Sequence, residues 1–103
     1  MVLAYSGTEY EDNAFDCTVR ETWAEKKFSM GLDFPNLPYY IDDDVKLTQS
    51  NAILRYLGRK NGLYGSNDVE ASTIDMLIDE AQDFKMALVK LAFNPDFVCL
   101  CVK

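Results

Sequence analysis

Two prolines, Pro35 and Pro38, most constrain what this chain of 103 residues can fold into. Proline has no backbone N–H and disfavours helical backbone in the residue before it, so residues 32–38 are predicted to be extended. Residues 39–48 then contain two strand-like runs on either side of three consecutive aspartates, which suit a turn. The sequence therefore predicts a β-hairpin that is entered through a proline-punctuated segment.

A helix is predicted directly after this hairpin. It begins at Ser50 or the residue before it and ends at Asn61-Gly62, because glycine suits the end of a helix. Within it, Ile53, Leu54 and Leu57 recur at helical spacing and are expected to form one buried stripe.

A second, longer helix follows a polar segment rich in glycine. Asn67 or Asp68 is expected to cap it, and Asn94-Pro95 is expected to end it. Its apolar positions follow the helical period over about five turns. These positions are Ile74, Leu77, Ile78, Ala81, Phe84, Leu88, Leu91 and Ala92.

Two weaker elements are predicted before the prolines. Residues 6–17 mix aromatic and acidic side chains and are expected to form an edge strand. Residues 20–27 are expected to form a short helix or a loop, and they contain Trp23, the only tryptophan.

Composition excludes several functions. The net charge of -7 argues against a nucleic-acid partner, because phosphate binding needs clustered lysine and arginine. No apolar run approaches the ~20 residues of a membrane helix, so no membrane partner is expected. Histidine is absent, which excludes Ser-His-Asp and Cys-His nucleophiles.

The three cysteines suggest no disulfide framework, so a cytoplasmic location is expected. Cys99 and Cys101 could in principle bind a metal, but two thiolates without further ligands make a poor zinc site. No metal is therefore predicted, and the terminal segment is expected to be the ragged end of a truncated or mis-spliced product.

Three motifs together carry a family resemblance: Trp-Ala-Glu-Lys-Lys-Phe at 23–28, Gly-Leu-Asp-Phe-Pro-Asn-Leu-Pro-Tyr-Tyr-Ile-Asp at 31–42, and Lys-Leu-Thr-Gln-Ser-Asn-Ala-Ile-Leu-Arg-Tyr at 46–56. In order and spacing they closely resemble the mu class of glutathione S-transferases. The resemblance implies an α/β fold. A partial thioredoxin-like domain would span residues 1–62, a linker residues 63–68, and the start of an all-α domain residues 69–103.

Leu37-Pro38 is the first candidate contact with a ligand. Proline makes a cis bond accessible, and a cis bond here would turn the backbone N–H and C=O of Leu37 outward to pair with an extended peptide. An ordinary entry into a strand is the alternative. The resemblance implies that the bond is cis and that these backbone groups bind the cysteine of glutathione.

Gln49-Ser50 is the second candidate contact with a ligand, because it lies where a predicted strand ends and a predicted helix begins. The first turn of a helix offers N–H groups and partial positive charge, which suit a carboxylate. Ser50 could equally be an ordinary N-cap. The resemblance implies that both residues bind the γ-glutamyl end of glutathione.

Trp23 and Lys27 share a helix face if residues 20–27 are helical, and an indole N–H with an ammonium could hold a carboxylate. The alternative is a packed ring with a solvated amine. The resemblance implies that the pair binds the glycyl carboxylate of glutathione. The resemblance also implies that Arg20 assists in binding this carboxylate and that Asn36 is a further contact with glutathione.

The resemblance also implies a homodimer. Asp83 matches a residue that reaches the glutathione of the partner subunit, and Phe34 and Arg55 match residues of the dimer interface. A rigid, exposed Phe34 between prolines would suit an interface anchor, and a core phenylalanine is the alternative.

The implied function is conjugation of glutathione, as co-substrate and without a cofactor, to electrophilic small molecules in detoxification. The family's catalytic tyrosine lies in an opening strand with a Gly-Tyr-Trp segment, to which nothing here corresponds, so no catalytic residue is predicted. The chain is expected to lack that strand, its helix and most of the all-α domain. A non-catalytic glutathione-binding or dimerisation module, or an inactive gene fragment, remains the alternative.

Overall fold

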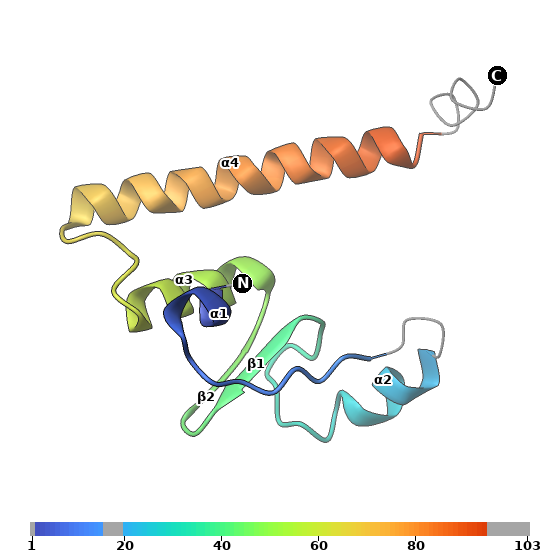
Figure 1. The fold of residues 1–103 in the computed structure, drawn as a ribbon. Helices are drawn as coiled ribbons and strands as arrows, with labels where there is room; N and C mark the ends of the chain where they lie inside the picture. The colour runs from blue at the N-terminus through green and yellow to red at the C-terminus, as the bar shows by residue number, and fades with distance from the viewer. Residues whose placement is uncertain (1, 16–19, 95–103) are drawn as a thin grey trace. The chain divides into compact units, whose positions relative to one another are not determined.

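The computed structural model describes residues 2–15 and 20–94 (Figure 1). The chain divides into two compact units, Met1–Tyr64 and Gly65–Lys103, and each is treated by itself. The elements of the first unit are α1 (Val2–Ser6), α2 (Arg20–Lys26), β1 (Tyr39–Asp42), β2 (Val45–Thr48) and α3 (Ser50–Lys60). The second unit contains α4 (Asp68–Ala92).

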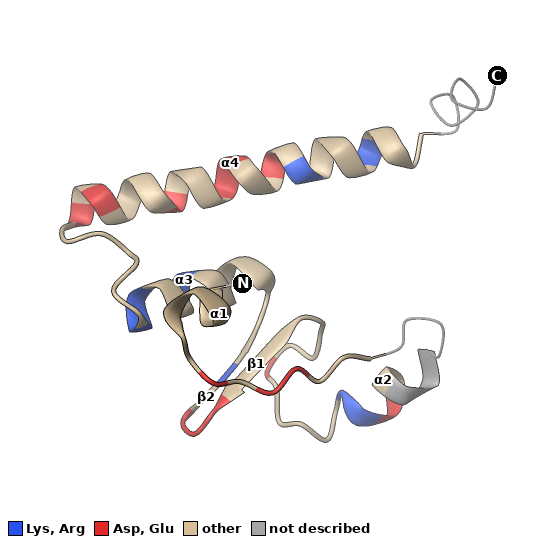
Figure 2. Cartoon of the chain, in the orientation of Figure 1, with Lys and Arg blue, Asp and Glu red and all other residues tan. Residues whose placement is uncertain are grey.

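The predicted β-hairpin is confirmed. β1 and β2 pair antiparallel, with Tyr39 opposite Thr48 at the open end and Asp42 opposite Val45 at the turn. Acidic residues occupy this turn, which is coloured red in Figure 2. The loop before the hairpin is tied to β2, because Lys46 Nζ donates to the carbonyl of Met30 at 2.9 Å.

Helix α3 packs against α1 and both strands and supplies the centre of a thin core. Leu57 is 5% exposed, and Leu32 and Tyr64 are the other buried apolar residues in the described part of the chain. The predicted apolar stripe is confirmed at Leu57 but wrong at Leu54, which is 41% exposed. One hairpin and one short helix cover only a narrow face of α3, so its neighbouring positions stay open to solvent.

Glycine allows Tyr64 to close against α3. A Cβ added at Gly58 would lie 3.0 Å from a ring carbon of Tyr64, so any larger residue would push the ring away. The guanidinium of Arg59 covers the same ring, 4.4 Å from its centroid. Tyr64 thereby seals the end of the first unit, two residues past Gly62.

The predicted edge strand over residues 6–17 is wrong in the part that is described. α1 ends at Gly7, which has a φ of 67°, and the N–H groups of Gly7 and Thr8 bond back to Ala4 and Leu3. Residues 7–15 then form no strand. A strand needs a neighbour to pair with, and within the described residues β1 pairs only with β2. Residues 16 and 17 lie outside the described residues.

Helix α4 begins as predicted, because Asn67 Oδ1 accepts hydrogen bonds from the N–H groups of Val69 and Glu70, both at 3.0 Å. It ends at Ala92, close to the predicted stop. The predicted helix is confirmed, but no residue of α4 is buried, and Leu77 and Phe84 are exposed. Among the described residues of this unit, α4 is the only helix, so its apolar face has no second element to pack against there.

Candidate functional site

The register of the hairpin brings two of the predicted contact segments together. Because Tyr39 pairs with Thr48, the next residues outward along the two strands, Pro38 and Gln49, are neighbours at the open end of the hairpin. Leu37-Pro38 and Gln49-Ser50 therefore border the same place, although 11 positions separate Pro38 from Gln49 in the sequence. The amino end of α3 also lies there, since α3 begins at Ser50.

The Leu37-Pro38 peptide bond is cis. The expectation of an unpaired Leu37 N–H is wrong in one respect, because this N–H donates to the side-chain oxygen of Asn36 at 2.9 Å. A short polar side chain readily bonds the backbone beside it in a turn. The bond is exposed, so an incoming carbonyl group could take the place of Asn36.

Gln49 has left-handed backbone, with φ 72° and ψ 112°, and is the only non-glycine residue with positive φ among the described residues. Such a conformation costs about 1–3 kcal/mol and is found most often at functional sites. Gln49 is also the N-cap of α3, and its side chain makes no capping hydrogen bond. The alternative in which Ser50 is an ordinary N-cap is therefore wrong, since Ser50 is the first residue inside the helix.

Trp23 lies in α2 and is half-buried among aromatic rings. Its indole stacks on the ring of Tyr39, with centroids 6.1 Å apart and an interplanar angle of 7°. Phe15 meets the indole edge-on at 5.2 Å and the Tyr39 ring at 6.3 Å. We call Phe15, Trp23 and Tyr39 the three-ring cluster. It fixes Trp23 beside the open end of the hairpin, because Tyr39 directly follows Pro38.

Lys27 lies one helical turn after Trp23, as predicted, and its N–H bonds the Trp23 carbonyl at 2.9 Å. Its ammonium, however, lies 4.7 Å from the centroid of the Phe28 ring. The ring that the ammonium contacts is thus that of Phe28. The backbone of Arg20 begins α2. Whether these residues bind a carboxylate stays a prediction.

A cavity of about 1060 Å³ opens beside β1. Residues 8–15 line one side of it, and residues 37–42 line another, so it includes Leu37 and Pro38. Phe15 and Tyr39 of the three-ring cluster line it as well. This volume is slightly larger than the usual range of small-molecule sites, about 300–1,000 Å³.

The remaining predicted residues are placed as follows. Phe34 is 76% exposed, so the alternative of a core phenylalanine is wrong. Arg55 is half-buried on α3, and Asp83 is exposed on α4. These positions leave the proposed dimer contacts as predictions.

An ionic cluster that sequence reasoning missed links β1 to the end of α3. Asp42 pairs with Lys60 and accepts a hydrogen bond from the Tyr40 hydroxyl at 2.8 Å. The hydrogen bond from Lys60, followed by that from Tyr40, lowers the pKa of Asp42 from 3.8 to about 2. The carboxylate in turn raises the pKa of Lys60. Burial and then the Asp42 hydrogen bond raise the pKa of Tyr40.

This cluster predicts how stability depends on pH. A carboxyl group whose pKa is lower in the folded state stabilises the fold above its unfolded pKa, and this contribution is lost as pH falls through the folded pKa. Asp42→Asn should therefore lower the melting temperature at neutral pH. The difference in melting temperature between this variant and the unmodified chain should disappear as pH falls from 3.8 to about 2. Thermal melts followed by circular dichroism test this, with Asp44→Asn as an exposed control in the same turn; equal effects of both substitutions would contradict it.

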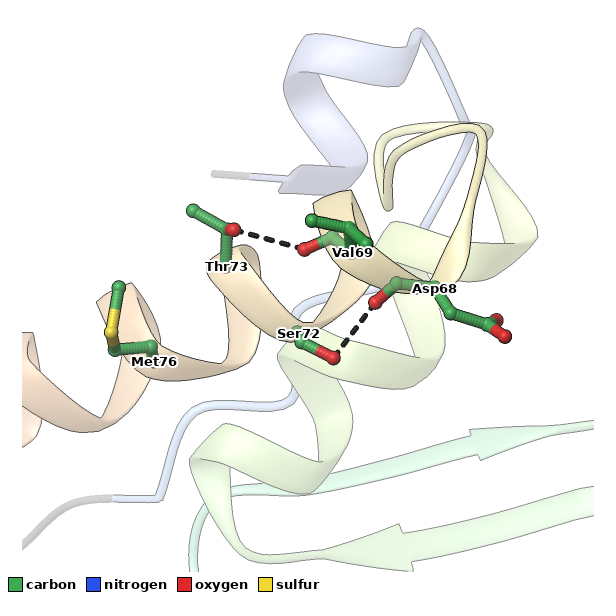
Figure 3. A pocket seen from close by; sticks show the side chains of 5 residues that line it. All are labelled: Asp68, Val69, Ser72, Thr73 and Met76. Atoms are coloured by element: carbon green, nitrogen blue, oxygen red, sulfur yellow. Dashed lines mark hydrogen bonds between the residues drawn. The ribbon is translucent and has the colours of Figure 1, made fainter.

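A second, smaller cavity of about 380 Å³ lies along the first turns of α4 (Figure 3). The hydroxyl groups that line it bond their own helix: Ser72 donates to the Asp68 carbonyl at 2.7 Å, and Thr73 donates to the Val69 carbonyl at 2.9 Å. These polar groups are already satisfied within the helix. The cavity therefore lacks the convergent polar groups that would orient a ligand.

Neither a metal site nor a membrane span is found in the described part of the chain. No three acidic or cysteine side chains come together there in a way that could hold a metal ion. None of the helices in residues 2–15 and 20–94 has both the length and the apolar content that crossing a lipid bilayer requires. Cys99 and Cys101, the alternative metal ligands, lie outside the described residues.

Residues 1–59 match the family described as "Glutathione S-transferase, N-terminal domain". This chain belongs to the glutathione S-transferase family. It is 47% identical to "Glutathione S-transferase class-mu 26 kDa isozyme 51" of Fasciola hepatica, over 94% of this chain and 44% of that protein. It is 45% identical to "Glutathione S-transferase Mu 7" of Rattus norvegicus, over 94% of this chain and 47% of that protein. The resemblance to the mu class is thus confirmed.

Solved structures agree with this membership in the transferase family. The crystal structure of the glutathione S-transferase Blo t 8 matches with a TM-score of 0.81 and 33% identity, over 92% of this chain and 45% of that one. A nematode-specific transferase of C. elegans matches with a TM-score of 0.74 and 32% identity, over 89% and 43%. The predicted mixed α/β, thioredoxin-like fold is confirmed. The chain spans about half the length of the relatives it matches.

Proposed function

We propose that this transferase chain binds glutathione at the open end of its hairpin, as part of an enzyme that conjugates glutathione to electrophilic small molecules. One observation carries the proposal. The pairing of Tyr39 with Thr48 makes Leu37-Pro38 and Gln49-Ser50 neighbours, and Gln49 holds strained backbone at that point. A backbone edge and a helix amino end side by side suit a peptide with a carboxylate at its end.

In the proposed complex each part of glutathione meets chemistry that fits it. The backbone groups of Leu37 pair with the cysteine residue of the tripeptide. The Ser50 hydroxyl, the α3 amino end and Gln49 bind the γ-glutamyl carboxylate. Trp23 binds the glycyl carboxylate through its indole N–H, and Lys27 and Arg20 are proposed to add positive charge there, as the resemblance to the mu class implies. Asn36 releases the Leu37 N–H as the ligand binds.

Conjugation requires the thiolate of glutathione, which attacks the electrophile and displaces its leaving group. We assign no catalytic residue to this chain. The compartment proposed for the reaction is the cytoplasm. A binding module without catalysis remains the second candidate, favoured by this lack of an assigned thiolate donor.

Two measurements on one sample test the proposal. Equilibrium dialysis of labelled glutathione against the purified chain should give saturable binding at one site per chain. Formation of a conjugate with 1-chloro-2,4-dinitrobenzene, an activated aryl chloride, then separates the two candidates. Binding together with conjugation supports a transferase, and binding without conjugation supports a binding module. Absence of saturable binding would refute both.

We further propose that the chain forms homodimers in which Phe34 is an anchor and Arg55 and Asp83 lie near the partner. Phe34 supports this because it is 76% exposed and adjacent to Pro35, and a large rigid aromatic group is a common interface hot spot. Exposing such a ring to water in an isolated chain is unfavourable. No nucleic acid or membrane is proposed as a partner.

Phe34→Ser should weaken this association by about thirtyfold or more, the loss typical of a hot-spot residue. Sedimentation velocity over a range of chain concentrations measures the dimer dissociation constant. Phe28→Ser is the matched control, because Phe28 is 74% exposed but lies outside the proline-flanked segment. A monomer at every concentration, or equal weakening by the two substitutions, would exclude the proposed anchor.

A further inference from the structure

The three-ring cluster has a use beyond packing. Trp23 is on a helix of seven residues, in a stretch of chain without strands, whereas Tyr39 begins β1. The stacked contact between them joins the two elements at a centroid separation of 6.1 Å. Phe15, from residues 7–15, which form no helix or strand, meets both rings edge-on. The position of the indole relative to the hairpin therefore depends on these ring contacts.

Tyr39 is central among the proposed contacts with glutathione. Its backbone follows Leu37-Pro38 directly, and it pairs with Thr48, the residue before Gln49. Its side chain holds Trp23 in a nearly parallel stack. One residue thus connects the segments proposed for the cysteine, the γ-glutamyl end and the glycine of the ligand.

We propose that Tyr39 is a positioning residue, which sets the distance between the Trp23 indole and the Leu37-Pro38 edge and so selects ligands by the carboxylate at their glycyl end. This inference rests on the proposed function. A hydrogen bond to a charged group depends steeply on geometry, so an indole free to tilt would lose most of its preference for a carboxylate. The stack prevents the tilt, because offset parallel rings resist rotation out of plane.

The aromatic ring of Tyr39, and not its hydroxyl, performs this role. Tyr39→Phe keeps both ring contacts and should behave as the unmodified chain does. Tyr39→Ala removes the ring that contacts both Trp23 and Phe15, and of the three contacts in the cluster only that between Phe15 and Trp23 remains. The two substitutions therefore separate positioning by the ring from any effect of the phenol.

The test compares two ligands by isothermal titration calorimetry with the full chain. The probes are reduced glutathione and its monoethyl ester, in which the glycyl carboxylate is blocked. The unmodified chain should prefer glutathione by about tenfold or more, the effect of one charge-assisted hydrogen bond. In Tyr39→Ala this preference should fall by about threefold to tenfold, the effect of one aromatic contact. Affinity for the ester should stay unchanged.

Each outcome separates positioning from loss of the fold and from failure of the proposed function. Equal weakening for both ligands, with Tyr39→Phe unaffected, would make the ring merely structural and overturn the inference. A preference in Tyr39→Ala as large as in the unmodified chain would also overturn it. If the unmodified chain binds both ligands equally, or binds neither, the proposed contact with the glycyl carboxylate fails, and the inference fails with it. Tyr5→Ala, an exposed tyrosine of α1, is the matched control and should change nothing.

Discussion

Leu57→Ala is expected to unfold the first unit. The described part of the chain buries only Leu32, Leu57 and Tyr64 among its apolar residues, and Leu57, in the second half of α3, is 5% exposed. Truncating a buried leucine to alanine costs about 2–5 kcal/mol, through lost burial and the cavity that remains. A core of this size has little stability in reserve, since small domains are marginally stable. Urea unfolding followed by circular dichroism should show that the cooperative transition is lost or shifted to much lower urea.

Leu54→Ala is the matched control, because it makes the same chemical change three positions earlier on the same helix. Leu54 is 41% exposed, so its truncation removes less buried surface and leaves no enclosed cavity, and it should lower the free energy of unfolding clearly less than Leu57→Ala does. If the two variants unfold at the same urea concentration, α3 does not pack through Leu57, and the described core is wrong.

Ser50→Ala should weaken glutathione binding by about ten- to hundredfold, the effect of losing one hydrogen bond to a charged group. Ser50 is the first residue inside α3, and the N-cap Gln49 makes no side-chain capping bond. Loss of the Ser50 hydroxyl should therefore change the stability of α3 little but lower the affinity for glutathione strongly. Isothermal titration calorimetry gives the affinity, and a thermal melt of the same sample gives the stability.

Ser72→Ala is the control for this substitution. The Ser72 hydroxyl donates to the Asp68 carbonyl in its own helix, at 2.7 Å, so it also lies near a helix amino end. Its loss should leave the affinity for glutathione unchanged. If Ser50→Ala binds glutathione as the unmodified chain does, or if both serine variants lose the same affinity, Ser50 does not contact the ligand.

Much of the fold follows from local rules, and the hairpin is the clearest case. The prolines exclude a helix before it, the aspartates place its turn, and the start of α4 follows from the capping geometry of Asn67. These features depend on residues close in sequence, so pattern and propensity are enough to find them. The cis bond before Pro38 was implied by resemblance to the transferases rather than by the pattern alone.

The failures concern contacts between distant segments. Residues 7–15 have a composition compatible with a strand, but a strand forms only beside a partner, and sequence pattern does not supply one. The apolar stripe of α4 has the correct period, yet period alone says nothing about what covers a helix. The burial of Leu54 was predicted wrongly for the same reason. How much of a helix is buried depends on how wide a face the neighbouring elements cover.

Within the candidate site, the residues that sequence analysis missed are those whose contacts link positions far apart in the sequence. Asp42 and Lys60 are 18 positions apart, and Phe15 meets Tyr39 across 24, so neither pair leaves a local signal. Tyr39 could have been found, because an aromatic residue directly after Pro38 in a strand next to the predicted ligand edge is a natural neighbour for Trp23. The helical spacing of Lys27 from Trp23 was predicted correctly, but the contact of its ammonium with the Phe28 ring was not predicted.

Titration of glutathione into the purified chain, followed through the fluorescence of Trp23, tests the central claim most directly. Trp23 is the only tryptophan, and its stack on Tyr39 places it beside the proposed site. An equimolar mixture of free glutamate, cysteine and glycine is the control. The account predicts a saturable change with glutathione and none with the mixture. No change with glutathione, together with the emission maximum of a solvated indole, would contradict it.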